Sequence, residues 1–165
     1  MPKRHPALIP LSHDHHHGLA LALRCRKHAL GQLNPGDPAA LEACAAEVSR
    51  FFNKNLTPHF EAEETVLFPL MAAYEECREL VAQLEREHRE FRRLAARLGE
   101  PGALRKSLFD FGDLLEQHIR SEERRLFAAF EMFVPPPDAE RAGQEIKRLL
   151  EQGQAAGAGA GTVTP

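Results

Sequence analysis

The chain has 165 residues, of which 43% are hydrophobic and 27% are charged, and its formal net charge is −3. This length and balance predict one soluble globular domain with its own core. Because lysines and arginines are scattered among acids, and no apolar run approaches the ~20 residues that cross a bilayer, we expect neither nucleic acid nor a membrane as a partner.

Hydrophobic residues recur at the helical period in four long segments, whereas alternating strand patterns are nearly absent. The first segment, 12–30, ends at Gly31. The second, 38–73, contains Pro58, which we expect to kink or divide the helix because proline lacks a backbone N–H.

The remaining segments continue this pattern toward the C-terminus. The third, 75–98, stops before Gly99, and the fourth begins near residue 103 and ends at the prolines 135–137. A shorter amphipathic segment, 138–150, is expected to pack on the outside of the other helices.

Four comparable helices joined by short loops bury their apolar stripes against one another. We therefore predict an all-α fold, an antiparallel up-down-up-down four-helix bundle with a short extra C-terminal helix. Residues 1–151 would form this single domain. Residues 152–165 are rich in alanine and glycine, have little to bury, and are expected to be disordered.

Polar residues continue the apolar stripes of three predicted helices instead of interrupting them. His59 and Glu63 lie on the second stripe, His88 on the third, and His118 with Glu122 on the fourth. Residues four apart lie one above the other on a helix, so each His-x-x-x-Glu pair directs two side chains to one place. Burying such groups is costly unless they are paired or bind a metal, so their convergence favours a transition-metal site.

The first helix offers several candidates for a further ligand. Its start contains four histidines around Asp14, namely His13, His15, His16 and His17. If Leu19 and Leu23 mark the inward face, counting back three residues from Leu19 selects His16, and counting back four selects His15. We favour His16, then His15.

A single histidine on an apolar face is more often an ordinary core residue, and a single His-x-x-x-Glu pair is more often a surface hydrogen bond. Here the pair occurs twice, within a local repeat: residues 59–64 followed by a Leu-Phe pair resemble residues 118–123 followed by another. A repeat of polar residues on buried stripes favours metal binding. Iron, zinc and manganese all suit imidazole and carboxylate ligands.

These motifs resemble those of the hemerythrin-like, or HHE cation-binding, family over residues 10–133. The carriers are Asp14-His15-His16, the stretch from His59 to Pro69, Glu87-His88, and His118-x-x-x-Glu122-Glu-x-x-Leu-Phe. The resemblance implies a non-haem di-iron site in which two iron ions are bridged by carboxylates and by an oxo or hydroxo group. The four histidines (His16 or His15, His59, His88 and His118) would be terminal ligands, and Glu63 and Glu122 would bridge the ions.

The sequence departs from the oxygen-carrying hemerythrins on the third helix. Those proteins have His-x-x-x-His there, whereas this chain has His88 followed by Arg92, and arginine does not ligate iron. The chain is more similar to the branch with four histidines and two glutamates, which includes proteins that repair iron centres after nitrosative stress. Fewer nitrogen ligands imply more open positions.

Three classes of function remain. The first, which we favour, is binding or sensing of O₂, NO or peroxide, or the handling of iron. The second is a di-iron oxidoreductase that reduces NO or peroxide or repairs iron centres, and the third is a metal-free helical adaptor. A redox partner would serve the first two, and the chain would act as a monomer or homodimer.

The cysteines and the N-terminus indicate the compartment. Cys25, Cys44 and Cys77 are odd in number and form no CxxC pair, which argues against a disulfide framework and a thiolate zinc site. We interpret them as small apolar helix residues. Residues 1–10 are too short and too broken by proline for a secretory signal, so we predict a cytoplasmic protein.

Overall fold

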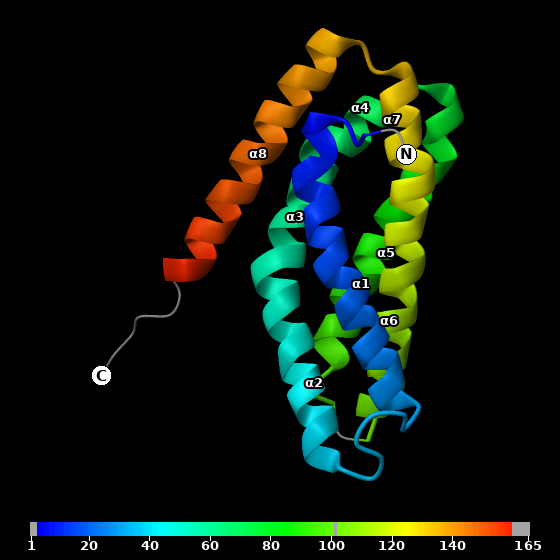
Figure 1. Ribbon diagram of the computed structural model, residues 1–165, viewed down its shortest axis with the longest axis vertical. Helices are drawn as coiled ribbons and strands as arrows, with labels where there is room; N and C mark the ends of the chain where they lie inside the picture. The colour runs from blue at the N-terminus through cyan, green and yellow to red at the C-terminus, as the bar shows by residue number, and fades with distance from the viewer. Residues whose placement is uncertain (1–2, 101, 160–165) are drawn as a thin grey trace.

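The computed structural model describes residues 3–100 and 102–159, and within these residues the regular structure is entirely helical. Long helices lie side by side along the longest axis of the molecule (Figure 1). They are α1 (Ile9–Ala29), the run of α2 (Pro38–Phe51), α3 (Thr57–Ala62) and α4 (Phe68–Ala72), then α5 (Arg78–Arg97), the run of α6 (Leu104–Ser121) and α7 (Phe127–Phe133), and finally α8 (Pro136–Gly159). The prediction of a helical bundle is confirmed.

The helix that contains Pro58 is wound more loosely just before this proline. A π-helical turn, Phe52–Leu56, separates α2 from α3, and the Thr57 hydroxyl donates a hydrogen bond to the Phe52 carbonyl at 3.0 Å. Because proline removes a backbone donor, the wider turn and the hydroxyl replace the regular hydrogen-bonding pattern. The expected interruption therefore takes the form of a π turn within a continuous helical run.

Two further π turns begin at the glutamates that the sequence placed on the apolar stripes. One, Glu63–Leu67, joins α3 to α4, and the other, Glu122–Leu126, joins α6 to α7. Single π turns within α-helices are frequent at functional sites because they redirect a side chain without ending the helix. The local repeat in the sequence thus corresponds to a repeated irregularity of the backbone.

Small residues bring α1 and α6 close together. A Cβ atom added to Gly112 would lie 2.7 Å from the Ala22 carbonyl oxygen, and one added to Gly18 would lie 2.9 Å from the Ile119 side chain. Both glycines are buried. A side chain at Gly112 would meet the backbone of α1, so this glycine allows the close approach of α1 and α6, whereas at Gly18 the contact is with the end of the Ile119 side chain.

Apolar side chains form two core clusters at different levels of the bundle. One contains Leu11, Leu84 and Phe127, and the other contains Leu21 and Phe91, so α1 and α5 each contribute to both. The stripe histidines and glutamates fall between these residues in the sequence. A buried polar layer therefore separates the two apolar clusters.

Helix α8 packs along the outside of α3 and extends beyond the predicted end of the C-terminal helix (Figure 1). The expectation of disorder from residue 152 is wrong for residues 152–159, which are helical; residues 160–165 lie outside the described part of the chain. A Cβ added to Gly153 would meet Pro58 at 2.2 Å. The absence of a side chain at Gly153 thus allows contact with α3, which sequence composition could not indicate.

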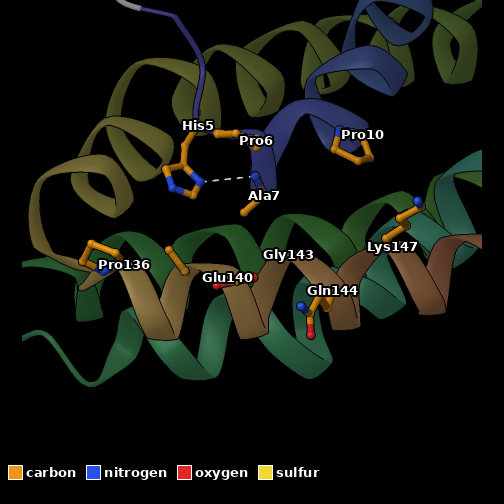
Figure 2. Close-up of a pocket in the computed structure, with 10 residues that line it drawn as sticks. His5, Pro6, Ala7, Pro10, Pro136, Glu140, Gly143, Gln144 and Lys147 are labelled. Carbon is orange, nitrogen blue, oxygen red and sulfur yellow. Dashed lines mark hydrogen bonds between the residues drawn. The ribbon is translucent and has the colours of Figure 1, made fainter.

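The N-terminal segment rests on α8. The amide N–H of Ala7 donates to His5 Nδ1 at 3.2 Å and caps a short 3₁₀ turn, Pro6–Leu8 (Figure 2). A Cβ added to Gly143 would lie 2.9 Å from the Ala7 Cα, so the turn and α8 are in close contact. A groove of about 430 Å³ runs alongside this contact. No helix among the residues described here has the length and apolar character needed to cross a membrane.

Candidate metal centre

Six buried polar side chains converge in the layer between the two apolar clusters. Each is at most 4% exposed, and both glutamates are fully buried. Within the described residues they form two groups of four potential ligands that share the glutamates: His15, His59, Glu63 and Glu122 in the first half, and His88, His118, Glu63 and Glu122 in the second half.

The two glutamates each direct one oxygen to each half. Glu63 Oε1 lies 3.1 Å from His59 Nε2, while its Oε2 lies 3.4 Å from His88 Nε2. Glu122 Oε2 lies 3.1 Å from His15 Nε2, while its Oε1 lies 3.4 Å from His118 Nε2. Carboxylates with this arrangement are suited to bridging two neighbouring cations.

The histidines face one another in pairs. His15 Nε2 lies 3.2 Å from His59 Nε2 in the first half, and His88 Nε2 lies 3.3 Å from His118 Nε2 in the second half. A proton can sit between the nitrogens of one pair, but two unprotonated nitrogens this close would repel each other. A cation is attracted to both lone pairs, so each pair is suited to a metal ion.

An outer layer of acids orients the four imidazole rings through their Nδ1 atoms. His15 pairs with Glu123 at 2.7 Å, His59 with Asp14 at 3.1 Å, His88 with Glu64 at 2.8 Å, and His118 with Glu87 at 2.6 Å. An acceptor at Nδ1 favours the proton on that nitrogen and leaves Nε2 free to ligate. Sequence reasoning assigned no role to this layer, although each acid is the sequence neighbour of a stripe residue: Asp14 precedes His15, Glu64 follows Glu63, Glu87 precedes His88, and Glu123 follows Glu122.

The electrostatics of the cluster favour positive charge. Burial alone would lower the pKa of His59, but the carboxylates of Glu63 and Asp14 raise it to about 10. Burial alone would raise the pKa of Glu63, but His59 and His88 hold it well below its ordinary value. The Glu63 carboxylate thus retains its negative charge and requires either protonated imidazoles or a cation beside it.

The carboxylates also lack ordinary hydrogen-bond partners. All four oxygens of Glu63 and Glu122 are buried without a hydrogen-bond donor of suitable geometry. Buried carboxylate oxygens without donors are strongly disfavoured unless a cation compensates them. The residues present therefore fit a metal centre.

Comparison with known proteins agrees with this geometry. Residues 7–130 match the family described as the hemerythrin HHE cation-binding domain. The chain belongs to this family. No curated protein and no solved structure matches the chain significantly. The hemerythrin match begins before α1 and ends within α7, includes all six clustered side chains, and leaves α8 outside.

On the first helix of this hemerythrin domain, the structure places His15 in the cluster and not His16. His15 is 4% exposed, whereas His16 is exposed. The preference for His16 followed from treating Leu19 and Leu23 as inward-facing, but Leu23 is 46% exposed. The inward face of α1 instead passes through Leu11 and His15, since both are buried four residues apart.

Arg92 contacts the outer layer of acids in the structure. Arg92 is largely exposed and donates two hydrogen bonds to the Glu64 carboxylate, at 2.9 and 3.0 Å. Glu64 in turn accepts from His88, so the arginine supports the outer layer of the second half. Arg4 has the corresponding position in the first half, where it pairs with Glu123 at 2.6 Å.

Proposed function

We propose that this protein is a non-haem di-iron protein that binds or senses O₂, NO or peroxide, or handles iron. His15 and His59 would hold one iron ion, and His88 and His118 the other. Glu63 and Glu122 would bridge the two ions. When bound, the iron pair would supply reversible redox chemistry and affinity for small ligands.

The observation that carries the proposal is the shared use of the two glutamates. Each is fully buried, each lacks a hydrogen-bond donor, and each points one oxygen at either histidine pair. A single cation would leave half of these oxygens uncompensated. Two cations use all four, which supports a dinuclear centre.

We also propose that the bundle has the antiparallel up-down-up-down arrangement. The four helical runs are joined in sequence by short connections, which favour antiparallel neighbours. This arrangement would give each run one contribution to the centre: His15 from α1, His59 and Glu63 from α3 and the turn after it, His88 from α5, and His118 and Glu122 from α6 and the turn after it.

Open coordination positions support small-ligand binding. Each group contains four protein residues, which is fewer than octahedral iron coordination takes. Because Arg92 points to Glu64 rather than into the cluster, it does not fill the position that histidine has in oxygen carriers. The remaining positions would be available to O₂, NO or peroxide.

The same open positions favour a second candidate, a di-iron oxidoreductase that reduces NO or peroxide or repairs iron centres under nitrosative stress. This activity would need a redox partner as the electron source. A cytoplasmic location and a monomeric or homodimeric state remain part of the proposal and rest on the sequence.

The metal content and optical spectrum test the function directly. The protein is purified without air, loaded with ferrous iron, and measured before and after O₂ or NO is added. We expect two iron ions per chain and a new charge-transfer band after exposure. If the protein binds only trace metal, the metal-free adaptor is supported instead. If it retains zinc or manganese in preference to iron, that metal replaces iron in the proposal.

Turnover separates the two functional candidates. With a chemical reductant present, an oxidoreductase consumes NO or peroxide continuously, whereas a binding or sensing protein consumes no more than its iron content. We expect stoichiometric consumption. The Glu63→Gln variant serves as the matched control because it should remove the iron centre while preserving the side-chain volume.

A further inference from the structure

Two cysteines from different helices meet in the apolar cluster that contains Leu21 and Phe91. Cys25 in α1 and Cys44 in α2 have their Sγ atoms 3.8 Å apart. Both are buried, at 0% and 3% exposure. Cys77 packs in the other apolar cluster and is therefore separate from this pair.

The surroundings hold the two thiols in place. A Cβ added to Gly112 of α6 would lie 3.0 Å from the Cys25 Cβ, so Cys25 is closely packed against that helix. Arg24, next to Cys25, forms an ion pair with Glu47, which is one turn after Cys44. This pair links α1 and α2 beside the sulfurs.

We propose that Cys25 and Cys44 form a reversible intramolecular disulfide when the protein meets a peroxide. The two sulfurs are in contact, and a modest approach of the side chains would allow a bond. The site is independent of the metal centre, because none of the clustered histidines or glutamates takes part in it.

The chemistry assigns different roles to the two thiols. The contact with Cys25 lowers the pKa of Cys44, and the same contact raises the pKa of Cys25. The Cys44 thiolate, which also keeps the small exposed fraction, would attack a peroxide oxygen, break the O–O bond and become a sulfenic acid. The Cys25 thiol would then attack the Cys44 sulfur and release water. In total, two thiols lose two electrons and two protons, and hydrogen peroxide is reduced to two water molecules.

The bond would close the segment between α1 and α2. Cross-linking Cys25 to Cys44 encloses the loop between these helices and restricts the unfolded chain. Oxidation should therefore raise the melting temperature, and a thiol reductant should reverse the increase.

Thiol counting and peptide mapping test the proposal on the full chain. The reduced protein is freed of reductant without air and treated in parallel with hydrogen peroxide and with diamide, a thiol oxidant that needs no metal. Of the three cysteines, we expect free thiols to fall from three to one in both samples, with residues 25 and 44 in one non-reduced peptide. Dithiothreitol should restore all three.

Single variants provide the controls. Cys77→Ser should lose both of its remaining thiols on oxidation, whereas Cys44→Ser should form no intramolecular disulfide. Circular dichroism before treatment confirms that each variant is folded. Three persistent thiols in the folded protein, a bond that involves Cys77, or a disulfide with diamide but not with peroxide would each overturn the proposal.

Discussion

The two halves of the metal centre use the same ligand types in different surroundings. In the second half, His88 is fully buried and stacks on Phe60 with ring centroids 3.8 Å apart. In the first half, His15 is 4% exposed and lies on α1, where it stacks on Phe127 at 5.5 Å. Three buried phenylalanines, Phe60, Phe68 and Phe91, face the histidines of the second half, whereas those of the first half face Phe127 and Phe60.

The outer layer shows the same difference. Glu123, in the first half, accepts hydrogen bonds from Ser12 and Arg4, which belong to the N-terminal part of the chain. Glu64, in the second half, pairs with Arg92 of α5 within the bundle. Identical inner chemistry can thus be supported by a terminal segment on one side and by a core helix on the other, which makes the first half the easier one to perturb.

Removing a shared glutamate should cause the largest loss of bound iron, and both halves should lose iron together. We expect Glu63→Gln or Glu122→Gln to remove most bound iron from both halves, because each oxygen faces a different histidine pair. Metal analysis after ferrous loading measures this. Glu61, which is exposed, provides the matched control, and Glu61→Gln should keep full iron content. Equal losses in all three variants would contradict the assignment.

Replacing a histidine should affect one half more than the other. We expect His15→Ala to lose about one of two ions, since only the first half uses His15, while His16→Ala retains both. Iron content together with the spectrum after O₂ distinguishes the variants. A greater loss in His16→Ala than in His15→Ala would show that the ligand on α1 has been misassigned.

The pH dependence of the metal-free protein should include contributions from His59 and Glu123 of the first half. The pKa of His59 is raised from 6.5 to about 10, so its stabilising contribution is present below pH 6.5 and is lost as the pH rises through about 10. The pKa of Glu123 is lowered from 4.5 to about 2, so its contribution is present above pH 4.5 and is lost as the pH falls through about 2. Urea unfolding across this range should show stability falling by a few kcal/mol at most toward pH 10.

The matched control for the alkaline change is His59→Gln, which should flatten the dependence between pH 7 and 10. A wild-type free energy of unfolding that stays constant over this interval would contradict the pairing of His59 with the two carboxylates.

Changes in the outer layer should have smaller effects. We expect Glu123→Gln and Glu64→Gln to weaken metal binding roughly 10–100-fold, because each acid orients a ligating imidazole. The loss should be greater for Glu123, which also accepts from Ser12 and Arg4. Chelator competition measures the affinity. Arg92→Gln keeps Glu64 and removes only a largely exposed ion pair. It should therefore change the free energy of metal binding by less than about 1 kcal/mol.

Glu123 and Glu61 each lie close in sequence to a clustered residue, and helical spacing alone does not distinguish them. The 2.7 Å contact between Glu123 and His15 Nδ1 distinguishes the two glutamates. If Glu123→Gln and Glu61→Gln bound iron equally well, the contact would have no role in metal binding.

Much of the centre could be predicted from the sequence because helical periodicity is a local property. His59 and Glu63, like His118 and Glu122, are four residues apart, so any α-helix places them on one face. The apolar residues around them show that this face is buried. The family resemblance, now confirmed over residues 7–130, added iron as the expected metal.

Two features depended on contacts between segments and could not be predicted from spacing. The choice of His15 over His16 follows from the rotation of α1 in the bundle, which buries Leu11 and His15 and exposes Leu23. The helical conformation of residues 152–159 is accompanied by a close contact of Gly153 with Pro58 of α3.

The sequence by itself determined the helices, their buried stripes and five of the six clustered polar side chains, because each of these follows from periodicity within one segment. Only the tertiary structure decided which histidine of α1 joins them, which acids orient the rings, and that Cys25 lies against Cys44. Those relations join residues on different helices, and helix rotation and close packing determine them only after the chain has folded.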